Sequence, residues 1–188
     1  MSIHQRGRGP NPLARAVSLF YPESERSTDG TTRGDFAMGE LTLESRAFDD
    51  GERIPEEYGY TARNVNPPLE VDGVPDDADS LALIVDDPDA KDPAGKVWDH
   101  WIVWNIPPET ETIPEAWEPT DATEGTNDYG ERGYGGPNPP DREHTYRFTL
   151  FAVDTTLGLG PGTDADDLES AVEGHVTDRA RLEGTYPA

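Results

Sequence analysis

The sequence contains no cysteine, and Lys91 and Lys96 are its only lysines. Without cysteine the chain can form no disulfide, no thiolate nucleophile and no cysteine-based metal site. Long apolar runs are also missing: no stretch approaches about 18 residues, and the apolar segment 13–21 is interrupted by Arg15 and Ser18. We therefore expect a cytoplasmic protein with no stable membrane insertion.

Positive charge is scarce as well, because 39 acidic residues face 15 lysines and arginines and give a formal net charge of −24. This composition favours a halophilic protein, in which a high net charge keeps the surface hydrated. The alternative is an acidic protein that works at ordinary salt concentrations. Either way, nucleic acid is not expected as a partner. In molar salt the Debye length shrinks to about 3 Å, so a local pocket can still bind a phosphate.

Charge also divides the chain into two parts. Residues 1–36 carry five arginines against four acidic residues and contain many Gly, Pro, Ser and Thr, whereas the remainder is strongly acidic. We interpret 1–36 as a basic, flexible N-terminal tail and 37–188 as one folded domain. The alternative is that the tail is an arm that docks on the acidic domain or on a partner.

Apolar periodicity predicts that this domain consists mainly of strands. The predicted strands are a half-buried one from Leu41 to near Phe48 and three convincing ones at 80–85, 98–106 and 144–153. Residues 109–143 have little strand pattern and are predicted to form a long loop region. The one helix candidate is capped by Thr163 or Asp164 and ends near Gly174. The residues after it are predicted to form a short strand; the alternative is that they continue the helix.

Strand alternation predicts which side chains share a face. The three sets are Leu81, Leu83, Val85 and Asp87; Trp98, His100, Ile102 and Trp104; and His144, Tyr146, Phe148 and Leu150. Each set is apolar and has polar groups at one end. If the strands are neighbours, these polar groups meet at the rim of an apolar surface, as in many ligand pockets. The alternative, hydrogen-bonded histidines within the core, stays open on the residues alone.

Four segments extend this pattern. They are Asp-Pro-Asp-Ala at 87–90, Trp-Asp-His-Trp at 98–101 with Asn-Ile-Pro at 105–107, Gly-Tyr-Gly-Gly-Pro-Asn-Pro-Pro at 133–140 with His-Thr-Tyr-Arg-Phe at 144–148, and Glu-Gly-His-Val at 173–176 with Gly-Thr-Tyr at 184–186. Together they resemble the phosphatidylethanolamine-binding protein family, in its bacterial and archaeal Raf-kinase-inhibitor-like branch. Lys91 replaces a proline of the family motif, which leaves the conformation after Asp89 open.

The resemblance implies a mainly β fold: an antiparallel β-sandwich with Greek-key connections and a flanking C-terminal helix. It also implies a small pocket for phosphate-like anions and phospho-headgroups. By position, the ligand-binding residues would be Asp87, Asp89, His100, Gly136, Pro137, His144, Tyr146 and, more weakly, Tyr186. No cofactor or metal is expected. Asp87 is expected to orient one of the two histidines, and the Gly136 N–H to approach the anion.

We therefore expect non-catalytic binding of a small anionic or phospho-headgroup ligand, with a regulatory role like that of kinase or protease inhibitors. Protein partners and a homodimer are compatible with this expectation. The alternative is a hydrolase that uses the His and Asp residues, but no serine lies between Ser80 and Ser170, and Thr145 should point away from His144. A metal site is a further alternative, although the spacing of a helical zinc motif is missing.

Overall fold

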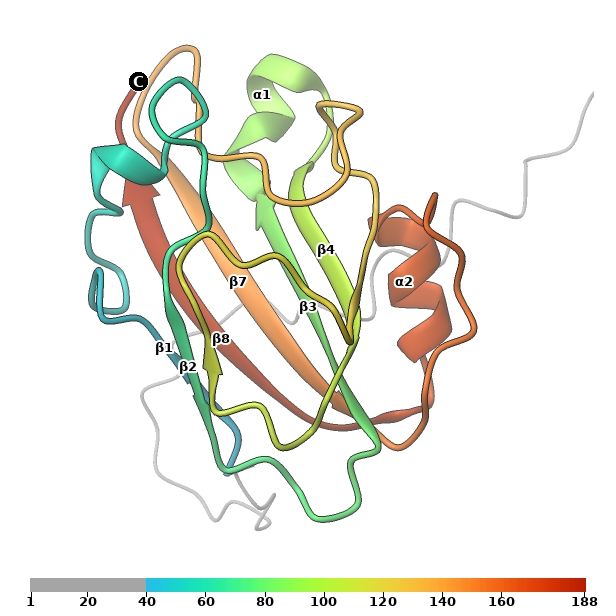
Figure 1. Cartoon of the computed structure of the whole chain (residues 1–188). Helices are drawn as coiled ribbons and strands as arrows, with labels where there is room; N and C mark the ends of the chain where they lie inside the picture. Colours follow the sequence, from blue (N-terminus) through green and yellow to red (C-terminus); the bar gives the residue numbers. More distant parts are fainter. Residues whose placement is uncertain (1–39) are drawn as a thin grey trace, which may run out of the picture. The chain divides into compact units, whose positions relative to one another are not determined.

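The computed structural model describes residues 40–188; the predicted tail, 1–36, lies outside them. The described chain forms two antiparallel sheets and a flanking helix (Figure 1), which confirms the predicted fold class. The larger sheet has the order β6-β4-β3-β7-β8, and the smaller one β1-β2-β5. The strands are β1 (Thr42–Glu44), β2 (Leu69–Asp72), β3 (Ser80–Asp87), β4 (Trp98–Ile106), β5 (Thr112–Ile113), β6 (Thr123–Glu124), β7 (His144–Val153) and β8 (Val176–Tyr186). The helical segments are η2 (Glu56–Tyr58), η3 (Pro88–Ala90), α1 (Lys91–Ala94) and α2 (Ala165–Val172).

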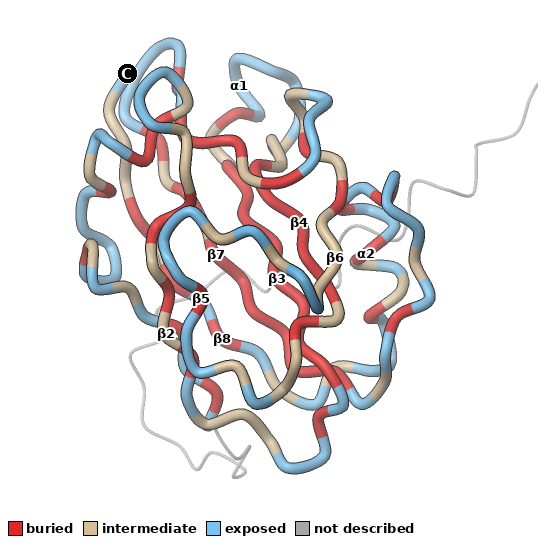
Figure 2. Tube along the Cα trace, viewed as in Figure 1, coloured by how far each residue is buried: buried red, intermediate tan, exposed pale blue. Residues whose placement is uncertain are grey.

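The strands of the larger sheet consist mostly of buried residues (Figure 2), and apolar side chains fill both of its sides. One cluster lies between the two sheets, where Leu83 and Phe148 pack with Leu69 of the smaller sheet. A second cluster joins the opposite face to α2, through Trp104 and Leu168 among others. Since both faces of β3 are covered, all eight of its residues are buried, and full burial of each large apolar side chain stabilises the fold by roughly 1.5–3 kcal/mol.

A β-bulge in β4 shapes the end of the larger sheet. Val85 of β3 pairs with Trp101, but the next residue, Asp86, pairs with Asp99, so His100 is an extra residue on β4. Such a bulge locally changes the alternation of side chains along the strand.

The bulge shows that one predicted face was wrong. The prediction had grouped Trp98, His100, Ile102 and Trp104 on a single face. In the structure, Ile102 and Trp104 pack in the cluster beside α2, whereas the neighbouring Trp101 packs between the sheets. Trp98 and His100 line a cavity together with Asp87 of β3. The other two predicted faces are confirmed, since their apolar residues all lie in the cluster between the sheets.

The segment after β3 turns tightly over the end of the sheet. The Asp87 side chain caps η3 by accepting hydrogen bonds from the N–H groups of Asp89 and Ala90, at 2.9 and 3.1 Å. Lys91 then begins α1 with αR backbone angles, and its N–H donates to the carbonyls of the preceding turn. A proline at this position could not donate that hydrogen bond. The conformation left open by Lys91 is therefore a short helical loop that ends at Gly95, with φ 80°.

The C-terminal part differs from its prediction in one respect. Helix α2 starts after Asp164, whose side chain accepts from the Asp167 N–H, and the chain turns at Gly174 with φ 84°. The following strand was expected to be short, but β8 has 11 residues. It is long because it pairs with β7 from His144 to Val153. The first strand is shorter than expected, at three residues.

The connection from β4 to β7 crosses to the smaller sheet as β5, returns as β6, and then places β7 beside β3. It is mostly loop, as predicted for 109–143. Within residues 40–188, no helix is long and apolar enough to cross a membrane.

Candidate functional site

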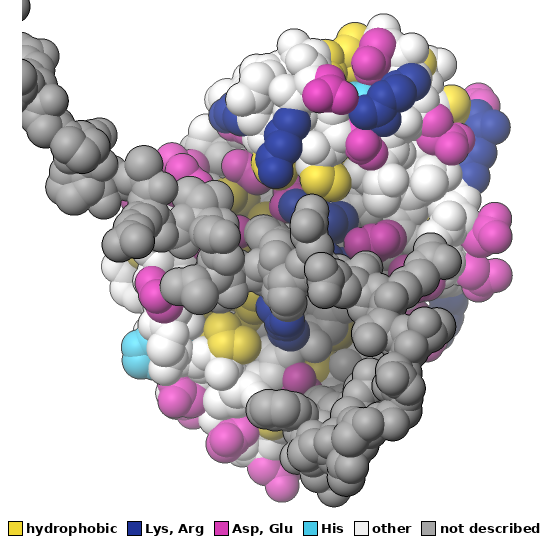
Figure 3. Space-filling model, turned by 180° about the vertical axis from the view of Figure 1, so that it is seen from behind, with side chains coloured by type: hydrophobic (Ala, Val, Ile, Leu, Met, Phe, Trp, Pro, Cys, Tyr) yellow, Lys and Arg dark blue, Asp and Glu magenta, His cyan; other side chains and the backbone are white. Residues whose placement is uncertain are grey.

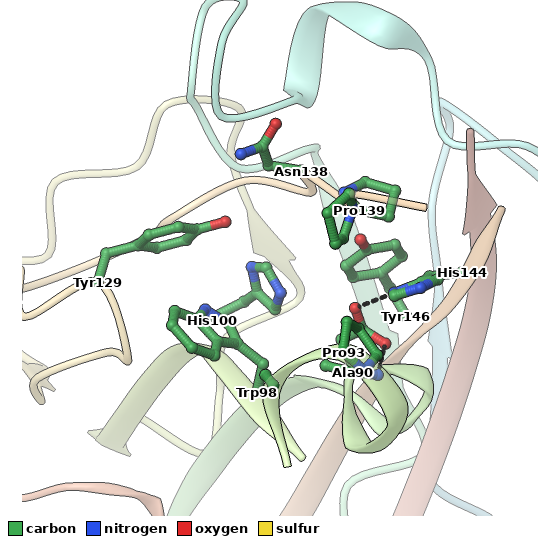
Figure 4. A pocket seen from close by; sticks show the side chains of 12 residues that line it. Ala90, Pro93, Trp98, His100, Tyr129, Asn138, Pro139, His144 and Tyr146 are labelled. Atoms are coloured by element: carbon green, nitrogen blue, oxygen red, sulfur yellow. Dashed lines mark hydrogen bonds and ion pairs between the residues drawn. The ribbon is translucent and has the colours of Figure 1, made fainter. Parts of the chain in front are cut away.

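A cavity of about 240 Å³ lies where β3 ends and where β4 and β7 begin. Because these three strands are antiparallel neighbours, these ends meet at one edge of the larger sheet. The cavity is lined by Asp87, Ala90, Pro93, Ala94, Trp98, His100, Tyr129, Asn138, Pro139, Pro140, His144 and Tyr146 (Figure 4). The segment η3–α1 and the loop residues Tyr129 and 138–140 therefore supply the walls that the strands do not.

His144 is held between two carboxylates. Its Nδ1 lies 2.7 Å from Asp87 Oδ2, the contact dashed in Figure 4, and its Nε2 lies 2.9 Å from Asp141 Oδ1. A carboxylate can only accept, so both ring nitrogens donate when both contacts are made, and the ring is then an imidazolium. Burial opposes this charge, but the hydrogen bonds and charges of Asp87 and Asp141 raise the pKa of His144. The predicted orienting role of Asp87 therefore applies to His144.

His100 has a different environment. Its Nδ1 lies 2.6 Å from the carbonyl oxygen of Gly135, and the residue is only 2% exposed. Burial lowers the pKa of His100, and it outweighs the neighbouring carbonyls of Gly135 and Gly136 and the carboxylate of Asp87. The two histidines of the cavity thus differ: the surroundings of His144 favour its protonated form, and those of His100 favour its neutral form.

Two buried donors in the cavity wall have no partner. The hydroxyl of Tyr146 and the indole Nε1 of Trp98 are inaccessible to bulk solvent, and neither has a partner in good hydrogen-bond geometry in the described part of the chain, although the Asp87 side chain and the Asn138 backbone lie close to the Tyr146 hydroxyl. Burial and the nearby negative charge of Asp87 raise the pKa of Tyr146, so its proton stays in place. A buried unpaired donor costs about 1–3 kcal/mol, which makes an acceptor in this cavity favourable.

Aromatic rings line the cavity. The His100 ring contacts Tyr146 and Tyr129 edge-on, at centroid distances of 5.1 and 5.7 Å, and Figure 4 shows it between them. Tyr129 also meets Trp98 at 5.5 Å and is supported from behind by Tyr60, stacked at 4.0 Å. These ring contacts fix the walls, so the cavity is largely formed before any ligand binds.

Two of the predicted site residues hold the surroundings of the cavity without lining it. Asp89 accepts from the Thr145 N–H at 2.9 Å and from Arg142. Although burial opposes it, these partners lower the pKa of Asp89 and tie the η3 turn to the start of β7. Tyr186 meets the Tyr146 ring at 6.5 Å, but its hydroxyl donates to the Glu56 carbonyl.

The predicted role of Gly136 is wrong. Its N–H donates to Asn64 Oδ1 at 2.8 Å and is not available to an anion. A Cβ at this position would lie 2.2 Å from the carbonyl oxygen of Tyr58, so glycine is needed for the close approach of two backbones. The adjacent Pro137 accepts from the Tyr60 N–H at 2.9 Å. Gly136 and Pro137 therefore dock the loop against residues 58–64.

Of the eight predicted residues, Asp87, His100, His144 and Tyr146 do line one cavity. Sequence reasoning missed Trp98 as a donor, although alternation from His100 places it on the same face. It also missed Tyr129 and Asn138, which lie in a loop region where no periodicity shows their direction.

The cavity has limited chemical capacity. No lysine, arginine, serine or threonine lines it, and within residues 40–188 no three His, Asp or Glu side chains are grouped so that they could hold a metal ion. It offers neutral donors, one imidazolium already bonded to carboxylates, and aromatic surface.

The chain is similar to known proteins in sequence and in fold. Residues 44–187 match the family model of the phosphatidylethanolamine-binding proteins. A UPF0098 protein of Methanothermobacter thermautotrophicus is 47% identical over 151 residues, which cover 78% of this chain and 98% of the relative.

Two solved structures superpose on the chain with a TM-score of 0.74. One is a phosphatidylethanolamine-binding protein homologue of Chlamydia trachomatis, 38% identical, with 79% of this chain and 97% of the homologue covered. The other is YbcL of Escherichia coli, 29% identical, with 79% and 99% covered. The chain belongs to the phosphatidylethanolamine-binding protein family.

Proposed function

We propose that the cavity binds a small phosphate-like oxyanion, free or as a phospho-headgroup, without catalysing a reaction. The observation that carries this proposal is the pair of buried, unpartnered donors, Tyr146 hydroxyl and Trp98 Nε1, in one cavity wall. Both groups gain an acceptor when an oxyanion enters, so the cost of burying them unpaired is recovered on binding.

The negative charge of Asp87 does not prevent this binding. Its carboxylate accepts from two backbone N–H groups and faces His144, whose protonated ring offsets its charge. The second carboxylate at His144, that of Asp141, is partly exposed to solvent. The remaining acidic charge is dispersed over the surface; Figure 3 shows it across the described part of one face, interspersed with lysines and arginines. We propose that the protein works at high salt, where these distant charges are screened within about 3 Å.

Calorimetric titration with inorganic phosphate in molar KCl tests the proposal. Tyr146→Phe removes one donor and should weaken binding about tenfold or more, since a hydrogen bond to a charged group contributes about 1.5–3 kcal/mol. Tyr58→Phe is the matched control, because Tyr58 is equally buried but its hydroxyl donates to Glu115 outside the cavity. Equal phosphate affinity in wild type and Tyr146→Phe would refute the proposed site.

The absence of a nucleophile supports a binding role over the hydrolase alternative. Among the described residues that line the cavity there is no Ser, Thr or Lys, and the chain has no cysteine. Thr145 follows His144 on β7, and its N–H is bonded to Asp89. Nucleophilic catalysis needs such a group beside the base. Turnover of phenyl ester or phosphoester substrates, lost in His100→Ala, would overturn the non-catalytic role.

A regulatory role follows if ligand occupancy changes the rim of the cavity, where Pro93, Asn138 and Pro140 are exposed. We propose a protein partner of this rim, in the manner of the kinase or protease inhibitors in the family, and no nucleic acid or membrane partner. A pull-down at high salt, with and without phosphate, tests this role. Recovery of the same proteins at both phosphate levels would count against it. Light scattering of the purified protein would show whether it is a homodimer.

A further inference from the structure

The hydrogen bond of His100 fixes which ring nitrogen faces a ligand. A carbonyl oxygen can only accept, so the contact of 2.6 Å with Gly135 requires a proton on Nδ1. In the neutral ring Nε2 then carries a lone pair and no proton. The Gly135 carbonyl is the only partner of His100 in good hydrogen-bond geometry in the described part of the chain, with the Gly136 carbonyl also nearby, and its imidazole lines the cavity between Tyr129 and Tyr146 (Figure 4). Nε2 is therefore a hydrogen-bond acceptor to which no donor in the described part of the chain is bonded.

The other polar groups of the cavity do not supply that donor. The Tyr146 hydroxyl forms no hydrogen bond with His100, although the two rings meet edge-on; the groups close to this hydroxyl are the Asp87 side chain and the Asn138 backbone. The His144 nitrogens are bonded to carboxylates. A bound ligand must thus accept from Tyr146 and Trp98 while donating to His100. An oxyanion that keeps one proton does both, whereas a fully deprotonated oxyanion, or a phosphodiester, which is an anion without a hydroxyl group on its phosphorus, cannot donate.

We infer that His100 makes the cavity selective for oxyanions that carry an acidic proton, such as a phosphomonoester monoanion or singly protonated inorganic phosphate, over sulfate and phosphodiesters. This inference rests on the proposed function and narrows it. It distinguishes two sources of a phosphate group: a free phosphate or monoester retains an ionisable hydroxyl, but the phosphate of an intact phospholipid headgroup is a diester and has none.

A matched pair of ligands tests the inference. Methyl phosphate and methyl sulfate have nearly the same shape, and at about pH 5.5 both are mainly monoanions, because a phosphomonoester has its second pKa near 6. They differ in one proton: the methyl phosphate monoanion keeps a hydroxyl group that can donate, and methyl sulfate has none. Calorimetric titration of the wild-type protein in the same molar KCl should show methyl phosphate binding about tenfold tighter, because methyl phosphate alone can donate a hydrogen bond to His100 Nε2.

A third ligand and a His100 variant test whether the donor to His100 is the acidic proton of the ligand. Glycerophosphoethanolamine, a diester with an ammonium group, should bind more weakly than methyl phosphate; tighter binding would show that an ammonium supplies the donor, and would overturn the inference. In His100→Asn the side-chain amide can rotate so that its NH2 group donates to the ligand. The ratio of the affinity for methyl phosphate to that for methyl sulfate should therefore fall towards one. A preference that persists unchanged in this variant would contradict the role of His100.

Nitrogen-15 chemical shifts of the histidines in labelled wild-type protein provide a readout that does not depend on a variant. The inference requires His100 to be neutral and protonated at Nδ1, and a proton at Nε2 would refute it. If methyl phosphate and methyl sulfate bind equally, the inference fails while the proposed function stands. If neither binds, both fail.

Discussion

Replacing Asp99 by asparagine should stabilise the protein at neutral pH and leave its stability near pH 4 almost unchanged. Asp99 lies between the cavity residues Trp98 and His100, and it pairs across the sheet with Asp86. Its N–H donates to Asp128 at 2.8 Å, so two carboxylates are close to its own. Further charged groups around this cluster are Lys96, which bonds Asp128, Arg147, which bonds Asp86, and Glu169 of α2.

Burial, followed by the charges of Asp128 and Asp86, raises the pKa of Asp99 from 3.8 to about 7. The folded state therefore holds this proton more tightly than the unfolded state. As pH rises from about 4 to 7, the unfolded chain ionises first, so stability falls through this window and is lowest above pH 7. At about 1.36 kcal/mol per pKa unit, ionised Asp99 would lower the free energy of unfolding by about 4 kcal/mol. We halve this figure to about 2 kcal/mol because solvent reaches part of Asp99 and screens its charge.

Thermal melts of wild type and Asp99→Asn at about pH 4 and pH 8, in the same molar KCl, test this prediction. Asparagine cannot ionise, so the variant should melt about 4–8 °C higher than wild type at pH 8, given about 2–4 °C per kcal/mol for a chain of this size. Asp77→Asn is the control, since it removes the same charge from an exposed turn. An equal gain in both variants, or a gain that does not grow with pH, would refute the reasoning.

Three further changes test other parts of the structure. Asp141→Ala removes the carboxylate at His144 Nε2 and frees this N–H for a ligand, so calorimetric phosphate affinity should rise about tenfold; the exposed Glu143→Ala should leave it unchanged. Gly136→Ala forces a Cβ against the Tyr58 carbonyl and should lower the free energy of unfolding in urea by about 1–3 kcal/mol; an unaffected midpoint would contradict the close approach. The melting temperature of the wild type should rise with KCl up to molar concentrations, because salt screens repulsion within a chain of net charge −24; a flat curve would count against a halophilic protein.

Sequence reasoning placed the main strands well because their apolar runs are long and are bounded by turns. The bounds of β4 and β7 agree with the predicted 98–106 and 144–153. The bulge at His100 could not be predicted, because it is a mismatch between two strands and appears only when β3 and β4 are paired. It is this mismatch that separates His100 from Ile102, with which alternation had grouped it.

The site was predictable in part for a similar reason. Family motifs pointed to the residues that surround the cavity, but a motif does not say which member meets a ligand and which holds the loop. Asp89 and Gly136 are bonded to Thr145 and Asn64, at sequence separations of 56 and 72, and no local pattern shows such contacts. Tyr129 is brought to the cavity wall by a loop with no periodicity.

A crystal structure grown with phosphate in molar KCl tests most directly whether the cavity is an oxyanion site. We predict an oxyanion within hydrogen-bonding distance of both Tyr146 hydroxyl and Trp98 Nε1, with one of its oxygens next to His100 Nε2. A structure in which phosphate lies elsewhere, or in which water alone satisfies these two donors at saturating phosphate, would contradict the account.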